Sequence, residues 1–207
     1  MTRVILLRHG EVEGIVPPRF RGRRDLDLSH LGRRQAQAAA ARIAHDWRPA
    51  LIYSSPMRRC LDTALPLASR CGLEVASLAD LNDLDFGDWQ WLTHEEARAH
   101  APALFERWLT HPQLVRFPGG ESLQDLFARA ANVLRLVLER HAGLTVVLVT
   151  HDSVTRALML QVLGLPPSAY WSVAQDPCGV SEVTYEGERA TVRLLNGTQH
   201  LAATGPG

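Results

Sequence analysis

Short apolar runs that alternate with helical repeats are the main pattern along the chain. Residues 3–7 are apolar without alternation, as in a central parallel strand buried on both faces, and residues 144–149 repeat that pattern. Turn residues punctuate the rest, most clearly at 118–120. The pattern predicts further strands at 50–54, near 74–76, and in a closing hairpin formed by 180–185 and 190–195.

Helices are predicted between these strands from periodicity and capping residues. Ser29 is a good N-cap for a helix to about His45, and Ser122 begins a long helix with one apolar stripe. Pro56 is expected in the first turn of a helix that runs to about Arg70. Further helices are expected at 94–100, at 102–109, from an N-cap at Asp152 or Ser153 to about Leu163, and after Pro166.

Strands that alternate with helices predict an α/β fold. We expect a three-layer α/β/α sandwich with a mostly parallel central sheet. The chain has 207 residues, which suits one domain better than two. The expected domain covers residues 1–201, with a loose C-terminal tail at 202–207.

Charge composition limits the classes of partner. Basic and acidic residues number 22 each, so no global field favours nucleic acid or an acidic membrane, and phosphate binding must be local. Every basic residue other than histidine is arginine, which rules out a phosphate site built on a P-loop lysine.

Cysteine spacing and apolar run length indicate the compartment. Three cysteines, Cys60, Cys71 and Cys178, are odd in number and lack metal-like spacing, so reduced thiols are expected and a disulfide framework or zinc site is not. The N-terminal apolar run is too short for a signal-peptide core, and no stretch approaches a membrane span. We therefore expect a cytoplasmic protein with no membrane partner.

Candidate chemistry lies just after the predicted strands. In an open α/β sheet, ligands bind beyond the carboxyl ends of the strands. Arg8 and His9 follow the first strand, Arg58 and Arg59 come shortly after the second, and His151 follows the strand at 144–149. Two histidines and at least two arginines are therefore expected to converge on one rim.

Such a cluster favours a phosphoryl group. The arginine fork suits phosphate oxygens, and neighbouring positive charge keeps an imidazole neutral and nucleophilic. Phosphoryl transfer needs mainly positioning and charge stabilisation, which these side chains supply without a metal. Six of the other histidines are expected to be ordinary surface or core residues: His30, His45, His94, His100, His111 and His141.

Five motifs in order resemble the histidine phosphatase superfamily, which has the phosphoglycerate mutase-like fold. They are LLRHGE at 6–11, RFRG at 19–22, YSSPMRRCLDTA at 53–64, LNDLDFGDWQ at 81–90 and VTHDSVTR at 149–156. PGGES at 118–122 is typical of the phosphatase branch, similar to α-ribazole phosphatases and broad-specificity bacterial phosphatases. The resemblance covers nearly the whole chain.

This resemblance implies a role for each matching residue. His9 is the nucleophile and passes through a phosphohistidine. Arg8 and Arg59 bind the transferred phosphoryl group, and His151 hydrogen-bonds its oxygens. Asp83 protonates the leaving oxygen and then deprotonates the attacking water.

Three positions depart from the family pattern. Asp83 stands where the family usually has the longer Glu, and nearby Asp85 remains a rival for the acid. Ile15 stands where the mutases and several phosphatases of the family have an Asn that binds phosphate. Arg21 in the same loop is a candidate to bind the phosphate instead. Asp152 replaces the Gly that usually follows the second histidine.

The resemblance implies a metal-independent phosphomonoester hydrolase that acts on a small phosphorylated metabolite and needs no cofactor. A phosphoglycerate mutase-type phosphotransferase and a non-catalytic phospholigand-binding protein remain alternatives. A metal hydrolase is disfavoured, because the sequence has no pair of histidines at the spacing of metal ligands. The pocket is expected between loop 11–24 and residues 84–117. Five aromatic residues lie in these stretches: Phe20, Phe86, Trp89, Trp91 and Trp108. Most of them are expected in the core, and one or two in the pocket wall.

Overall fold

The computed structural model describes residues 1–13, 15 and 17–202, so most of the predicted tail lies outside the described residues. The strands are β1 (Thr2–Arg8), β2 (Leu51–Ser54), β3 (Val75–Ser77), β4 (Thr145–Thr150), β5 (Val180–Glu186) and β6 (Arg189–Gly197). The α-helices are α1 (His30–Asp46), α2 (Arg58–Cys71), α3 (His94–His100), α4 (Pro102–Thr110), α5 (Leu123–Arg140) and α6 (Asp152–Val162). Short 3-10 helices are η1 (Ala79–Leu81), η2 (Gly87–Trp89), η3 (Pro112–Leu114), η4 (Pro167–Ser172) and η5 (Gln199–Leu201).

The strands of the described residues form one six-stranded sheet in the order β3-β2-β4-β1-β5-β6. Strands β3, β2, β4 and β1 are parallel to one another. Strand β5 runs antiparallel to β1 and forms the predicted hairpin with β6. The sheet is therefore mostly parallel, and the predicted fold class is confirmed.

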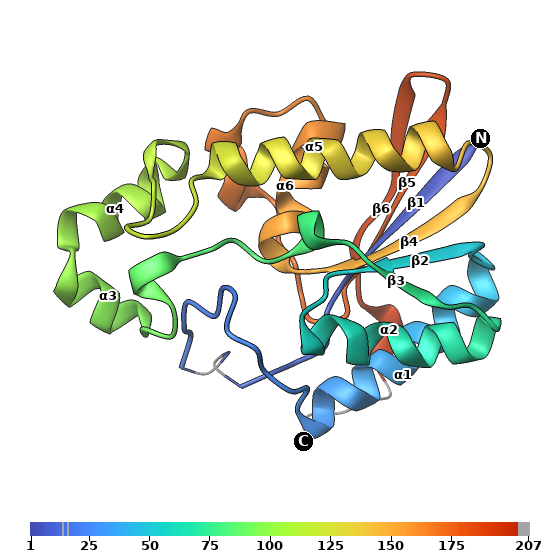
Figure 1. Ribbon diagram of the computed structural model, residues 1–207, viewed down its shortest axis with the longest axis horizontal. Helices are drawn as coiled ribbons and strands as arrows, with labels where there is room; N and C mark the ends of the chain where they lie inside the picture. The colour runs from blue at the N-terminus through green and yellow to red at the C-terminus, as the bar shows by residue number, and fades with distance from the viewer. Residues whose placement is uncertain (14, 16, 203–207) are drawn as a thin grey trace.

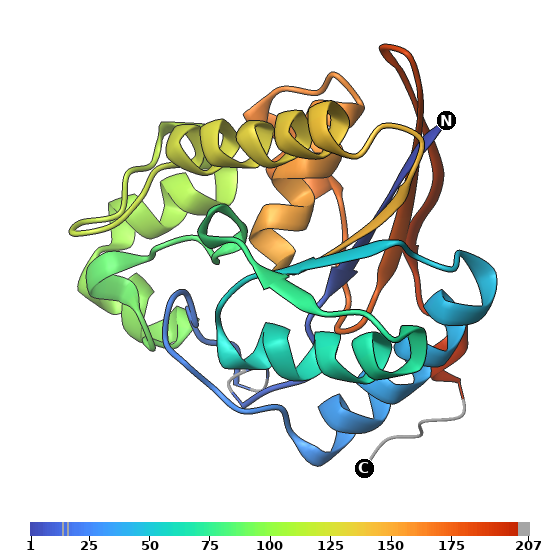
Figure 2. The same cartoon turned by 45° about the vertical axis from the view of Figure 1, so that its right-hand side comes forward.

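Helices cover both faces of the sheet, as Figures 1 and 2 show. Successive residues of β1 point to opposite faces: Val4 and Leu6 join the core beneath α5 and α6, while Ile5 and Leu7 join the core beneath α1 and α2. Because both faces are covered, the strand is apolar at each position from Val4 to Leu7, which explains the absence of alternation in its sequence.

The helix starts predicted at Ser29 and Ser122 are confirmed, whereas those predicted at Pro56 and at Asp152 or Ser153 are wrong. The Ser29 side chain accepts from Gly32 N, and Ser122 forms a capping box with Asp125. Helix α2 instead begins at Arg58, two residues after Pro56, because the chain stays extended through its N-cap Met57. Helix α6 has His151 as its N-cap, so neither Asp152 nor Ser153 caps it.

The segment between β3 and α5 lies beyond one end of the sheet. In Figure 1, α3 and α4 stand apart from the layers, at the far side from the N-terminus. The ends of β1 and β4 are joined there by a hydrogen bond from His9 N to Thr150 O (2.8 Å). This end of the sheet carries the candidate chemistry.

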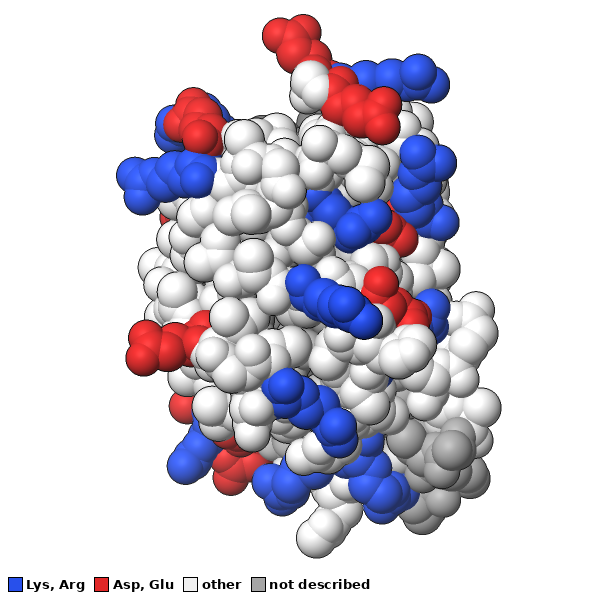
Figure 3. Space-filling model, turned by 90° about the vertical axis from the view of Figure 1, so that its right-hand side faces the viewer, with Lys and Arg blue, Asp and Glu red and all other residues white. Residues whose placement is uncertain are grey.

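Charged side chains are mixed on the face shown in Figure 3, where basic and acidic groups are scattered among broad uncharged areas. This agrees with the balanced composition. Among the described residues, no helix has the length and apolar content needed to cross a membrane.

Candidate active site

His9 is held at the end of β1 with one ring nitrogen bonded and the other bare. Its Nδ1 lies 2.7 Å from the carbonyl oxygen of Gly10, which only accepts, so Nδ1 carries the hydrogen. Its Nε2 is buried and has no hydrogen-bond partner among the described residues. Burial, followed by the charge of Arg59, holds the pKa of His9 well below its usual 6.5. The imidazole is therefore neutral, with a lone pair on Nε2.

Close backbone packing explains the glycine after His9. A Cβ on Gly10 would lie 2.5 Å from Gly32 O, so any side chain there would push α1 away from the site. Gly10 N also donates to Thr63 Oγ1 of α2 (3.0 Å). The turn formed by His9 and Gly10 is thus fixed against α1 and α2.

His151 and Arg59 form a fully buried pair beside His9, with the His9 and His151 ring centroids 5.2 Å apart. Arg59 Nε donates to His151 Nδ1 (3.3 Å), and His151 Nε2 lies 3.0 Å from Ser55 Oγ. Because Ser55 donates its own hydrogen to Asn82 Oδ1, Nε2 of His151 is the donor. Both ring nitrogens of His151 are therefore bonded to protein groups here, and it orients Arg59.

Arg59 also fixes the loop that precedes α1. Its Nη1 donates to Arg24 O (2.8 Å) and its Nη2 to Gly22 O (2.7 Å). The same Nη2 forms an ion pair with Asp83 Oδ2 at 3.1 Å. Arg59, rather than the exposed Arg58, therefore lies in the site, in the position that the sequence resemblance favoured.

Asp83 and Asp85 have different surroundings although they are two residues apart. Asp83 is 3% exposed and lines the central pocket. Burial raises the pKa of Asp83 and Arg59 lowers it, with a net upward shift. Asp85 Oδ1 accepts from Gly87 N (2.9 Å), and its Oδ2 lies 3.5 Å from Arg23 Nη1, so Asp85 stabilises a turn away from the pocket lining.

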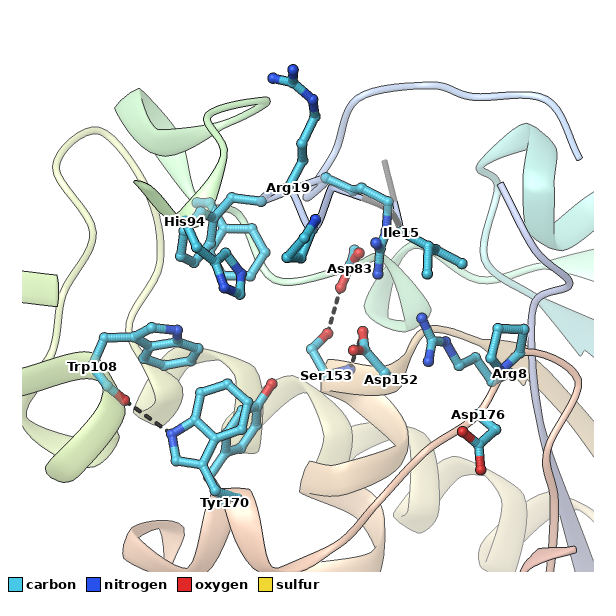
Figure 4. A pocket seen from close by; sticks show the side chains of 16 residues that line it. Arg8, Ile15, Arg19, Asp83, His94, Trp108, Asp152, Ser153, Tyr170 and Asp176 are labelled. Atoms are coloured by element: carbon cyan, nitrogen blue, oxygen red, sulfur yellow. Dashed lines mark hydrogen bonds between the residues drawn. The ribbon is translucent and has the colours of Figure 1, made fainter. Parts of the chain in front are cut away.

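The pocket has a volume of about 330 Å³ and opens onto Arg8, Arg21 and Asp83. Asp152 also faces it, as Figure 4 shows. Burial alone would raise the pKa of Asp152, but Arg8 and Arg21 outweigh burial and lower it, so Asp152 stays ionised. His9, Arg59 and His151 lie behind the residues that line this pocket.

Aromatic residues form the opposite wall of the pocket (Figure 4). Phe20, Phe86 and Trp108 line it, so three of the five aromatic residues considered are in the wall rather than one or two. Trp89 is fully buried in the core, as expected of most of the five. His94 is exposed, as predicted for a surface residue, and it also lines the pocket with its ring centroid 4.8 Å from that of Phe20.

Several pocket residues gave no recognisable signal in the sequence. Tyr170 and Trp171 of η4 complete the aromatic wall, and Ser153 lies beside Asp83. The main-chain carbonyl oxygen of Gln175 accepts a hydrogen bond from Arg8 Nη1. The buried side-chain amide of Gln175 has no hydrogen-bond partner among the described residues. Arg8 Nε is likewise buried without a partner, so unsatisfied polar groups gather beside His9.

A neutral imidazole with a bare nitrogen among arginines suits attack on a phosphate ester, because the arginines stabilise the phosphoryl oxygens while burial keeps the nucleophile unprotonated. The α/β fold brings these groups to the carboxyl end of a parallel sheet, where such folds bind ligands. Fold and site together are those expected of a phosphoryl-transfer enzyme.

Comparison with known proteins identifies the family. The sequence profile of the histidine phosphatase superfamily (branch 1) matches residues 4–198, so the chain belongs to that superfamily. It is 36% identical over 201 residues to phosphoserine phosphatase 1 of Hydrogenobacter thermophilus, covering 97% of this chain and 95% of that protein. It is 38% identical over 173 residues to a glucosyl-3-phosphoglycerate phosphatase of Mycolicibacterium vanbaalenii, covering 80% of this chain and 76% of that protein.

A solved structure from Escherichia coli, provisionally identified as an α-ribazole-5'-P phosphatase, superposes with a TM-score of 0.87. It is 25% identical and covers 95% of this chain and 97% of that chain. Family membership and the phosphatase relatives confirm the predicted resemblance and make the protein a phosphomonoesterase.

Proposed function

We propose that residues 1–201 form one catalytic domain, a metal-independent phosphomonoester hydrolase that acts through a phosphohistidine at His9. The observation that carries this proposal is the state of the His9 ring. Its Nδ1 donates to Gly10 O, and its Nε2 is bare and buried. A ring fixed in this tautomer offers its lone pair without any prior proton transfer.

In the first half-reaction, His9 Nε2 forms a bond to phosphorus as the bond between phosphorus and the ester oxygen breaks. Arg8, Arg21 and Arg59 stabilise the phosphoryl oxygens. His151 assists by holding Arg59, and its own contact with the phosphoryl group is part of the proposal. Asp83 gives its proton to the leaving oxygen, so the alcohol departs neutral.

In the second half-reaction, water attacks the phosphohistidine. Asp83, now ionised, takes a proton from that water as the bond between phosphorus and Nε2 breaks. His9 returns to its neutral form, inorganic phosphate leaves, and Asp83 is protonated again. One carboxyl group thus serves as acid and then as base, and the upward shift of its pKa favours the protonated form that the first step needs.

We propose a small phosphorylated metabolite as the substrate, with its alcohol portion against the aromatic wall. Relatives named for phosphoserine and for glucosyl-3-phosphoglycerate support hydrolysis of small phosphate esters over mutase chemistry. A cytoplasmic location is part of the proposal and rests on the free thiols of Cys60, Cys71 and Cys178.

Hydrolysis of p-nitrophenyl phosphate in EDTA tests this proposal. His9→Ala should lower kcat by about a thousandfold or more, because the nucleophile is lost. His45→Ala is the matched control, since the His45 side chain is 87% exposed, and it should retain the wild-type rate. Rapid quenching with a radiolabelled ester should leave label on the wild type and not on His9→Ala.

Each alternative has a distinct outcome in the same assay. Wild-type rates in His9→Ala would overturn the nucleophile assignment. Activity that EDTA removes would indicate a metal hydrolase. Phosphate binding without turnover of any phosphate ester would indicate a non-catalytic binding protein.

A further inference from the structure

The hydroxyl group of Ser153 is bonded to the carboxyl group of Asp83, across 70 residues of sequence. Ser153 Oγ donates to Asp83 Oδ1 at 2.5 Å, a short bond of the kind that a carboxylate accepts. Both residues line the pocket, and Figure 4 shows the bond between them as a dashed line. Ser153 is 2% exposed, so water does not compete strongly for this contact.

Counting donors and acceptors fixes the direction of this bond. Leu84 N donates to Ser153 Oγ (3.2 Å) and also to Asp83 Oδ1 (2.9 Å). A serine hydroxyl has a single hydrogen, and here it points to Oδ1. Asp83 Oδ1 therefore receives two donors, whereas Oδ2 receives one, from Arg59 Nη2, so Oδ1 is the more crowded position for a proton.

The other carboxyl oxygen faces the phosphoryl-binding groups. Asp83 Oδ2 lies 3.1 Å from Arg59 Nη2 and 3.6 Å from His151 Nδ1. A proton on Oδ2 leaves both bonds to Oδ1 in place, whereas a proton on Oδ1 would force the Ser153 hydrogen to turn away. The serine hydroxyl thus directs the acid proton to the side of the carboxyl group where the reaction occurs.

The position of Ser153 in the fold strengthens this effect. Ser153 lies in the first turn of α6, two residues after His151, so one rigid element carries both the second histidine and the group that orients the acid. Asp83 is one methylene shorter than the Glu expected from the family resemblance, and its reach therefore depends more on orientation.

We propose that Ser153 is a positioning residue for the general acid, whose hydroxyl group holds Asp83 Oδ1 and keeps the transferable proton on Oδ2. This inference rests on the proposed function, because it concerns the acid of that reaction. It adds a residue that acts through Asp83 and touches neither phosphorus nor the nucleophile.

Two aryl esters of similar shape test the proposal: p-nitrophenyl phosphate, whose leaving group needs little protonation, and p-methoxyphenyl phosphate, whose leaving group needs more. Ser153→Ala should lower kcat for the methoxyphenyl ester by about tenfold more than for the nitrophenyl ester, with KM nearly unchanged. Ser153→Thr keeps the hydroxyl group and should recover most of the rate.

A pH profile provides a readout that a purely structural role would not change. The Ser153 hydrogen bond lowers the pKa of Asp83, so removing it raises that pKa further. The alkaline limb of kcat/KM for the methoxyphenyl ester should then move to higher pH in Ser153→Ala. Asp83→Asn combined with Ser153→Ala should be no slower than Asp83→Asn alone, because both act on one group.

Thr155→Val is the matched control, because Thr155 donates a buried hydroxyl of the same helix to His151 O. Its effect on the two esters should be equal. Equal losses of kcat on both esters in Ser153→Ala would overturn the role of Ser153, and so would losses that add to those of Asp83→Asn. The proposed function would still stand in either case, provided that turnover depends on His9. A wild type that hydrolyses neither ester would overturn the proposed function and this inference together.

Discussion

At the residue scale, the same side chain takes different roles according to burial and partners. Asp83 and Asp85 belong to one loop and one sequence motif. Asp83 is buried against Arg59 and Ser153, whereas Asp85 accepts a hydrogen bond in a turn. The sequence left both as candidates for the acid, because residue type and spacing do not determine burial. The packing of α5 and α6 against the loop separates them.

Substituting each aspartate by asparagine tests this distinction. Asp83→Asn should slow the p-methoxyphenyl ester by about a hundredfold and the p-nitrophenyl ester much less, because only the first needs a strong acid. Asp85→Asn should cost about 1 kcal/mol of unfolding free energy and affect both esters equally. Steady-state rates and urea unfolding of the two variants provide the measurement, and the reverse pattern would make Asp85 the acid.

At the scale of elements, α5 holds the loop that carries the acid. Arg129 of α5 donates to Asp80 O, Asn82 O and Asp83 O, and pairs with Glu121 just before the helix. Glu121 in turn accepts from Asp85 N. The glutamate of PGGES, a motif noted only for its resemblance to phosphatases, is therefore one half of a clamp on this loop.

Removing this clamp should destabilise the protein and disturb the acid. Arg129→Ala leaves the carbonyl oxygens of Asp80, Asn82 and Asp83 without this donor and removes one of the two arginine partners of Glu121, and should cost about 3 kcal/mol of unfolding free energy. Arg135→Ala on the same helix is the control. The Arg135 side chain is 64% exposed, so its loss should cost less than about 0.5 kcal/mol in urea unfolding. Equal losses in the two variants would show that the clamp adds no stability.

At the scale of the whole molecule, the fold buries two histidines that an unfolded chain would expose. Burial, with Arg59 as the next cause, holds the pKa values of His9 and His151 well below 6.5. Below about pH 6.5 the unfolded chain gains protons at these residues that the folded protein does not bind. Asp83 acts in the opposite direction, because its raised pKa lets the folded state keep a proton above the ordinary value of 3.8.

Stability should therefore fall as the pH drops below about 6.5. Each histidine contributes a slope of up to about 1.4 kcal/mol per pH unit, or about 2.7 for both, reduced where Asp83 also titrates. Urea unfolding at a series of pH values from about 7.5 to about 5 measures this slope. His9→Gln should reduce this slope by the amount that corresponds to one proton taken up on unfolding, and His45→Ala should leave the slope unchanged. A flat wild-type profile would contradict neutral burial of the pair.

The sequence by itself determined the features that depend on neighbouring residues. Unbroken apolar runs predicted the buried parallel strands, and Ser29 and Ser122 marked two helix starts, because periodicity and capping are local effects. The rule that sites lie beyond strand ends then predicted that His9, His151 and the Arg58–Arg59 pair share one rim before any distance was known, and the family resemblance favoured Arg59. Local patterns were less informative where the chain remains extended past a strand, as at Pro56 and His151.

Only the tertiary structure decided which groups meet across the chain. It separated Asp83 from Asp85, bonded Ser153 to the acid, and placed Phe20, Phe86 and Trp108 together in the pocket wall. These contacts join loops from separate elements, and their distances follow from how helices pack on the sheet. Spacing along the sequence carries little information about them, because hydrogen bonds and burial depend on distance in space.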